Sequence, residues 1–149
     1  MNAVAPSKSD PVPVGERVGL EEDVRFVLSS WCASLRGVYP NRHVHDFWIR
    51  VPIDVRAHID RATTLIAYLE DQPDEIVSYL VFLRRRGIVI VHYAYTKDLA
   101  RRQGHAHNLL ALANPERLPV CFTQPARNEN VMAHFCRTAI FDPSLWLET

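Results

Sequence analysis

The sequence predicts an α+β domain in which a mixed, mostly antiparallel sheet is flanked by helices on both faces. In the middle of the chain, three consecutive segments are rich in β-branched and aromatic residues and are too short between turn signals to be helices. Segments with the spacing of amphipathic helices stand before and after them. Neither an internal repeat nor a domain boundary divides residues 18–149. Together with a length of 149 residues, these features predict a single domain.

Two helices are predicted before the strands. Apolar residues between positions 21 and 36 recur at helical spacing, and Gly37 is the expected end of this helix. The stretch VYPNRHVHDFWIRVP, residues 38–52, is rich in aromatic residues and histidine and is predicted to be an irregular loop. A short helix is expected over residues 54–62.

The three β-rich segments, TTLIAYLE, EIVSYLVFLRR and GIVIVHYAYT, are predicted to be consecutive antiparallel strands. The second is apolar on both faces and should therefore be central. A helix follows with an apolar stripe from Ala106 to Ala113, and Asn114 and Pro115 end it. The remaining elements are expected as a short buried strand in PVCFTQ, a helix in NENVMAHFCRTA and a final strand in IFDPSLWLE.

The charge balance limits the kinds of partner. Lys plus Arg and Asp plus Glu each number 17, so the formal net charge is zero. Broad, non-specific nucleic-acid binding relies on many uncompensated cations and is therefore not expected, although a local basic patch remains open. Cys32, Cys121 and Cys136 have no short spacing and fit free, apolar thiols in a reducing compartment.

The N-terminal segment, residues 1–17, is predicted to be a flexible tail because prolines and polar residues are scattered along it. It lacks the apolar core of a signal peptide. No apolar run approaches the ~18 residues that a membrane span needs. We expect a cytoplasmic domain.

The stretch TKDLARRQGHAHNLLALA, residues 96–113, joins a strand to a helix through a loop with two arginines and a glycine. The first N–H groups of a helix lack partners within it and, with the helix dipole, bind anions such as phosphate. Gly104 would let an anion approach without a Cβ in the way, and Arg101 and Arg102 add positive charge. A capped surface helix with arginines would look much the same, so the residues alone leave both readings open.

The segment RRQGHA resembles the R/Q-x-x-G-x-G/A signature of the GNAT N-acetyltransferase superfamily, and its strand–loop–helix context is also similar. Arg101 takes the first position, Gly104 the glycine and Ala106 the small residue. The blocks RFVLSSWCASLRG and VIVHYAYTKDLARRQGHA look most like small GNAT-type proteins of tailed bacteriophages. The resemblance covers roughly residues 18–149 and implies a GNAT-like fold with splayed central strands.

What the resemblance implies is binding of acetyl-coenzyme A. Its pyrophosphate would lie on the N–H groups of the signature, and its pantetheine arm would pair with the exposed edge of the preceding strand. An Asn that opens the next helix and the position seven residues later would complete the coenzyme site. The implied contacts are Ala94, Tyr95, Thr96, Arg101, Arg102, Gln103, Gly104, His105, Ala106, Asn128 and Phe135.

Two residues of the strand before the signature are the candidate catalytic groups. An amine must lose a proton before it attacks, and histidine suits that task, so His92 is the candidate general base. It could equally be a hydrogen-bonded strand histidine. Tyr93 and Tyr95 are expected on the opposite face of the strand from His92. Packing explains either tyrosine better than catalysis does, but Tyr95 is retained as a candidate.

The sequence departs from the family at the residue that usually protonates the leaving thiolate. Aligning Asn128 with the family's helix-opening Asn puts Phe135 where many members have a tyrosine. Phenylalanine donates no proton. A thiolate leaves tolerably without an acid, so both a catalytic and a non-catalytic GNAT-like protein are consistent with this substitution.

Other polar clusters have weaker interpretations. His43, His45 and Asp46 invite a metal site, but the further ligands it would need cannot be named, and we expect none. Asp46 and Trp48 are instead expected to contact the acceptor. The arginines 84–86 at a predicted hairpin tip indicate a solvated turn or a contact to an acidic acceptor.

We therefore expect an acetyl-coenzyme A-dependent N-acetyltransferase that acts on a primary amine. The acceptor is a small polyamine-like molecule, a protein lysine or N-terminus, or an aminoalkyl group on modified phage DNA. The alternative is a GNAT-shaped, virion-associated or interaction protein that keeps only the coenzyme site. A homodimer and, for a phage protein, a location in the host cytoplasm are further expectations.

Overall fold

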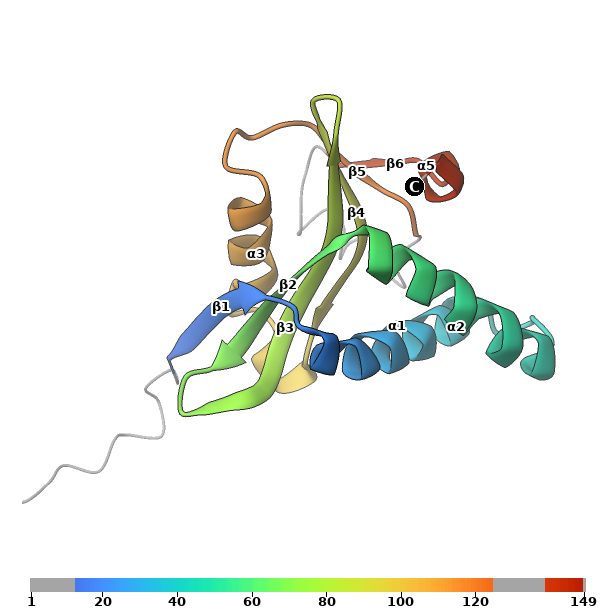
Figure 1. Cartoon of the computed structure of the whole chain (residues 1–149), viewed down its shortest axis with the longest axis horizontal. Helices are drawn as coiled ribbons and strands as arrows, with labels where there is room; N and C mark the ends of the chain where they lie inside the picture. The colour runs from blue at the N-terminus through green and yellow to red at the C-terminus, as the bar shows by residue number, and fades with distance from the viewer. Residues whose placement is uncertain (1–12, 125–138, 149) are drawn as a thin grey trace, which may run out of the picture.

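The computed structural model describes residues 13–124 and 139–148 and has one mixed sheet at its centre (Figure 1). The strands follow one another across the sheet in chain order. The first four are antiparallel, and the last two run parallel to their neighbours. Their bounds are β1 (Val14–Val18), β2 (Thr63–Leu69), β3 (Gln72–Arg85), β4 (Ile88–Thr96), β5 (Val120–Phe122) and β6 (Ile140–Phe141). The predicted α+β class and the central place of β3 are confirmed.

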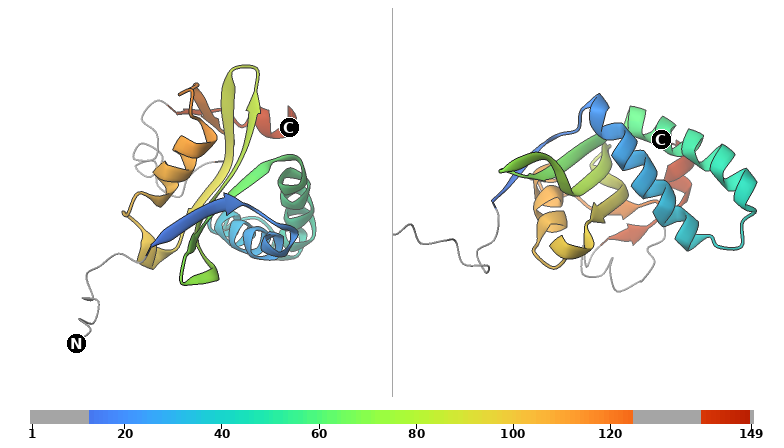
Figure 2. Two further views of the ribbon diagram at one scale, coloured as in Figure 1. Left: turned by 60° about the vertical axis from the view of Figure 1, so that its left-hand side comes forward. Right: turned by 90° about the horizontal axis from the view of Figure 1, so that it is seen from below.

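Helices cover both faces of the sheet (Figures 1 and 2). α1 (Val24–Val38), which follows the short turn η1 (Glu21–Asp23), and α2 (Val44–Arg61) lie on one face. α3 (His105–Ala113), which follows the turn η2 (Asp98–Ala100), lies on the other. The chain's described part ends in α5 (Ser144–Glu148). One apolar cluster forms under α1 and α2 and a second under α3, so the sheet is buried from both sides.

Residues 14–17, assigned from the sequence to a flexible tail, belong to the edge strand β1. This strand pairs with β2 from Val14↔Leu69 to Val18↔Leu65. The Arg17 guanidinium donates two hydrogen bonds of 2.6 and 2.8 Å to the buried Asp23 carboxylate. Asp23 also accepts from the Leu20 backbone N–H at 2.7 Å. These bonds lower the pKa of Asp23 below its usual value and tie β1 to the start of α1.

The stretch 38–52 was predicted to be a loop, but most of it is the first half of α2. This helix passes through Pro52, which costs on the order of 3 kcal/mol in a helix interior. Its buried face offsets that cost, because each fully buried side chain of this size contributes about 1.5–3 kcal/mol. The residues of that face, one helical turn apart, are Phe47, Val51, Val55 and Ile59.

The end of the chain also differs from the prediction. Instead of one strand over residues 140–148, a two-residue β6 is followed by α5. The Asp142 carboxylate accepts hydrogen bonds from the Ser144 backbone N–H at 3.1 Å and from its hydroxyl at 2.5 Å, and thereby caps α5. The first helix runs one residue past Gly37, to Val38. The predicted helix in NENVMAHFCRTA lies almost entirely outside the described residues.

The structure also describes two of the three cysteines and most of the predicted helices. Cys32 and Cys121 are free thiols, and burial raises the pKa of Cys32 to about 11, which makes it an inert apolar side chain. Cys136 lies outside the described residues. Among the helices that the structure describes, none combines the length and apolar character needed to cross a membrane.

Candidate coenzyme and acceptor site

The loop between β4 and α3 has the geometry of an anion site. Gly104 is the N-cap residue of α3 and adopts the left-handed conformation, with φ of 82°. Apart from the adjoining residues of the chain, no described atom lies within 4 Å of the position that a Cβ on Gly104 would occupy, so the space beside it is open. The first hydrogen bond of the helix runs from Asn108 N to Gly104 O at 2.9 Å. The N–H groups of His105 and Ala106 therefore have no acceptor within the helix and can serve a bound phosphate.

The side chains of this loop are mostly exposed, and some already have partners. Arg101 forms an ion pair of 2.8 Å with Asp98, and its Nε donates to Thr96 O at 3.3 Å. Arg102, also in a left-handed conformation at φ 64°, is exposed and forms no ion pair with any described residue. The Gln103 side-chain oxygen lies 3.1 Å from His105 Nε2. A phosphate bound in this loop could therefore pair with Arg102 without displacing a carboxylate.

Next to this loop, β4 and β5 separate. Their pairing covers only three positions, from Val89↔Val120 to Val91↔Phe122. The Thr123 backbone N–H donates to Val91 O at 3.2 Å and ends the ladder. Beyond it, Ala94 to Thr96 pair with β3 on one side and with no described strand on the other. The splayed strands expected from the sequence are present, and their free edge leads to the N-terminus of α3.

A bulge in β4 sets the place of His92. Tyr93 lies opposite Val81 while Val91 lies opposite Phe82, so His92 is an extra residue in β4. His92 and Tyr93 were expected on opposite faces, but both rings stack on Trp31, with centroids at 6.5 and 5.4 Å. The expected alternation is wrong here because the extra residue interrupts it.

His92 is 2% exposed and lies among aromatic rings. The rings of His58 and Trp146 meet it edge to face at 5.0 and 5.3 Å. Its Nδ1 lies 2.8 Å from the Thr123 hydroxyl oxygen. Burial, and secondarily the neighbouring His58, lowers the pKa of His92 to about 3. The ring is therefore neutral at physiological pH.

Tyr95, the second candidate catalytic residue, packs in the sheet–helix interface. Its ring stacks on Tyr79 at 5.1 Å and meets Phe26 edge to face at 5.8 Å. The Tyr79 hydroxyl bonds to Ser30 Oγ at 2.7 Å, and burial raises the pKa of Tyr79 well above its usual value. These contacts are those of a packed aromatic layer under α1.

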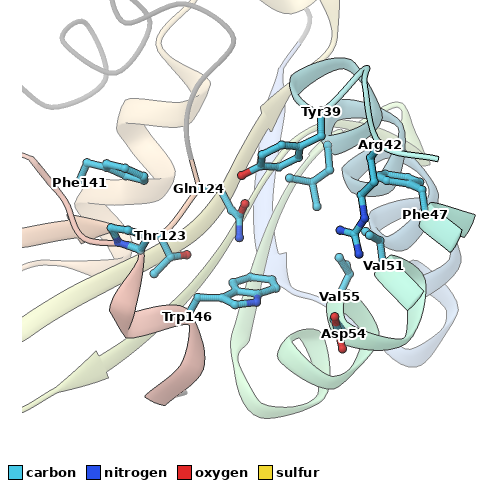
Figure 3. A pocket seen from close by; sticks show the side chains of 12 residues that line it. Tyr39, Arg42, Phe47, Val51, Asp54, Val55, Thr123, Gln124, Phe141 and Trp146 are labelled. Carbon is cyan, nitrogen blue, oxygen red and sulfur yellow. The ribbon is translucent and has the colours of Figure 1, made fainter. Parts of the chain in front are cut away.

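A pocket of about 260 Å³ opens on the α2 side of the point where β4 and β5 separate (Figure 3). Arg42 and Asp54 lie on its α2 side, and Thr123, Gln124 and Trp146 lie across from them. His92 does not line the pocket, but Thr123 and Trp146 line it and also contact His92. The full lining is Leu35, Tyr39, Arg42, Phe47, Val51, Asp54, Val55, Thr123, Gln124, Phe141, Pro143 and Trp146.

Asp46 and Trp48, the acceptor contacts expected from the sequence, lie outside this pocket. Both are exposed on α2. The stretch that contains them does supply Arg42, Phe47 and Val51 to the lining. The polar residues of this lining could not be predicted from the sequence. They come from four separate segments, and no pattern of spacing in the sequence shows that these segments meet.

The structure bears on some of the remaining residues that the sequence singled out. Within residues 13–124 and 139–148, no group of three or more His, Cys, Asp or Glu side chains could hold a metal ion. At the β3–β4 hairpin tip, Arg84 pairs with Glu116, while Arg86 and Gly87 take the left-handed conformations of a tight turn. Asn128 and Phe135 lie outside the described residues.

Comparisons with known proteins support the fold. No family model matches the sequence, and no curated protein does. Among solved structures, a ribosomal-protein-alanine N-acetyltransferase from Brucella melitensis biovar Abortus 2308 matches with TM-score 0.57 and 16% identity over 85% of this chain and 91% of its own. PaiA N-acetyltransferase from Thermoplasma acidophilum, in complex with coenzyme A, matches with TM-score 0.56 and 12% identity over 84% and 87%.

A predicted acetyltransferase with acetyl-CoA from Clostridium acetobutylicum matches with TM-score 0.53 and 13% identity over 83% of this chain and 89% of its own. The chain therefore has the fold of the GNAT acetyltransferases, as the signature around Gly104 indicated. At identities this low the likeness concerns the fold. The resemblance to phage proteins stays a prediction.

Proposed function

We propose that the protein is an N-acetyltransferase that transfers acetyl from acetyl-coenzyme A to a primary amine. The observation that carries the proposal is the separation of β4 and β5 beside the N-terminus of α3. The free edge at Ala94 to Thr96 can pair with an extended amide chain, and the open space at Gly104 can take a phosphate. Solved acetyltransferases of this fold with coenzyme A or acetyl-CoA bound support it further.

The chemistry proposed is direct transfer. The amine nitrogen bonds to the acetyl carbonyl carbon, the carbon–sulfur bond breaks, and the proton that nitrogen loses ends on the coenzyme's sulfur, directly or through water. The acceptor occupies the pocket of about 260 Å³, which is lined in part by Thr123, the residue at which β4 and β5 separate. This pocket size favours a small amine over a group carried on duplex DNA.

His92, the base expected from the sequence, reaches this pocket through Thr123. A group whose pKa is about 3 is a weak base at neutral pH. We infer that His92 acts as a positioning residue, whose Nδ1 accepts from the Thr123 hydroxyl and so fixes the hydroxyl oxygen as an acceptor for the amine N–H. The amine reaches the thioester after losing its proton to solvent.

Calorimetry with acetyl-coenzyme A tests the coenzyme site. We expect the wild type to bind and Gly104→Asp to bind about tenfold more weakly, because a carboxylate at the helix N-terminus repels the phosphates. Gly104→Asn is the matched control, since asparagine has nearly the same shape and tolerates the left-handed conformation without the charge. Equal binding by all three proteins, or no binding by the wild type, contradicts the proposed function.

Thr123→Val tests the hydrogen bond to His92. Valine keeps the shape of threonine but removes the hydroxyl, so we expect kcat/KM to fall about tenfold while coenzyme affinity stays unchanged. Thr123→Ser should retain most activity. The wild-type kcat/KM should rise with pH as the amine deprotonates. Because the pKa of His92 is about 3, titration of His92 should add no inflection between pH 5 and 7. Such an inflection, lost in His92→Asn, would instead identify His92 as the base.

A further inference from the structure

One face of α2 is apolar at its centre and is not covered by the described part of the chain. α2 runs along the outside of the molecule beside α1 (Figure 2). Its inner face is buried in the core through Phe47, Val51 and Val55. On the outer face, Ile49 and Ile53 are adjacent, one helical turn apart, and are 50% and 66% exposed. A pair of large exposed aliphatic side chains on one helix face is a candidate interaction surface.

The outer face of α2 also has the spacing of a coiled-coil seam. Its residues follow one another at intervals of three, four, three and four positions, the alternation that keeps side chains in one stripe along a helix. The stripe, which we call the α2 seam, consists of Asp46, Ile49, Ile53, Arg56 and Asp60. It is apolar at its centre and charged towards both ends.

The α2 seam is complementary to a second copy of itself in the antiparallel direction. The pattern is symmetric about position 51, since Ile49 and Ile53 lie two residues to either side of it and Asp46 and Arg56 lie five residues to either side. A two-fold axis at that level therefore places Ile49 against Ile53 of the partner subunit and Asp46 against Arg56 of the partner subunit. The axis generates each contact twice, so two apolar layers lie between two pairs of opposite charges.

The parallel direction is unfavourable for the same residues. Asp46 would face Asp46 of the partner subunit, and Arg56 would face Arg56 of the partner subunit, so both charged layers would be repulsive. Parallel pairing would also align the two helix dipoles, whereas antiparallel pairing places each helix N-terminus beside the C-terminus of its partner. Charge therefore selects one orientation of the two copies.

The two charged side chains have capacity for these contacts. Asp46 is exposed and forms no ion pair with any described residue. The Arg56 guanidinium donates from Nε to Asp60 and from one terminal nitrogen to Glu21, both at 2.9 Å. A guanidinium has five N–H groups, so others remain for a further carboxylate. The bonds to Asp60 and Glu21 also hold Arg56 in place on the outer face.

We propose that the protein forms a homodimer through the α2 seam, with the two helices antiparallel. The interface uses one face of one helix from each subunit, so it is small and the dimer forms at micromolar rather than nanomolar concentration. None of the residues of the seam lines the proposed acceptor pocket or belongs to the loop at Gly104. The inference is therefore independent of the proposed function.

Sedimentation velocity of the full chain over about 1–300 µM tests the dimer. We expect the sedimentation coefficient to rise from the value of a monomer towards that of a dimer. Ile53→Glu buries a carboxylate against Ile49 of the partner subunit and should raise the Kd of the dimer at least tenfold. Leu112→Glu is the matched control, because Leu112 is 55% exposed on α3, on the other face of the sheet, and should leave the Kd unchanged.

Circular dichroism should show the same helix content in both variants, since both positions are exposed. A wild type that stays monomeric over this range would overturn the proposal and leave the outer face of α2 to a different protein. A dimer whose Kd Ile53→Glu does not change would place the interface elsewhere and would overturn it as well.

Asp46→Arg tests the orientation of the two helices. In the antiparallel dimer the new guanidinium faces Arg56 of the partner subunit at two places, so the Kd should rise about tenfold. The double variant Asp46→Arg with Arg56→Asp exchanges the two charges and should recover most of that loss. In a parallel dimer position 46 faces itself, and one repulsive pair would replace another. An unchanged Kd in Asp46→Arg would therefore overturn the antiparallel arrangement.

Discussion

Replacing Trp31 by alanine should lower the free energy of unfolding by about 3–5 kcal/mol, the range for removing a large buried aromatic side chain. Trp31 is fully buried at the centre of the interface between α1 and the sheet. Its ring stacks on Tyr93 and meets Trp146 edge to face at 5.7 Å, so its loss leaves a cavity between α1, β4 and α5. Urea denaturation followed by circular dichroism measures the effect.

Trp31→Phe is the matched control for that prediction. The indole Nε1 has no hydrogen-bond partner among the described residues. The substitution by phenylalanine therefore removes a buried donor without breaking a hydrogen bond that stabilises the fold. It keeps an aromatic ring against Tyr93 and leaves a smaller cavity. We expect a loss of less than about 2 kcal/mol. Equal losses for the two variants would contradict the role assigned to the stacked ring.

The stability of the protein should fall by about 2 kcal/mol between pH 7 and pH 5 because of His92. Its pKa is about 3 in the folded protein and 6.5 as a free side chain, so the unfolded chain takes up the proton first as pH falls. The stability due to a neutral His92 is therefore present above pH 6.5 and is lost progressively down to about pH 3. Urea denaturation at half-unit steps of pH measures this slope.

His92→Asn should be less stable at pH 7 but should lack this slope, because asparagine does not titrate. His45→Asn, at an exposed position on α2, is the matched control and should keep the wild-type slope. A slope unchanged in His92→Asn would show that other groups account for it. The experiment also bears on the chemistry, since a ring that remains neutral at pH 5 is a weak base, as the proposed positioning role of His92 requires.

Local patterns were enough to predict most elements and the candidate coenzyme loop. The alternation of β2 to β4, the stripe of α3 and the signature around Gly104 each depend on residues close in sequence. The structure confirms the three strands and a helix that begins directly after Gly104. α2 was missed because Pro52 and the histidines before it looked like a loop, whereas burial of Phe47, Val51 and Val55 outweighs the cost of a proline.

The face of His92 and the composition of the proposed acceptor pocket depended on tertiary structure. A one-residue bulge turns His92 to the same side as Tyr93, and only the pairing with β3 specifies where that bulge falls. The polar residues of the pocket come from segments far apart in the chain, which meet because α1, α2 and α5 pack on one face of the sheet. The sequence by itself determined most of the strands and helices and the loop that carries Gly104, since neighbouring residues set backbone conformation. Only packing decided which side chains meet, because burial is shared among residues that are distant in sequence.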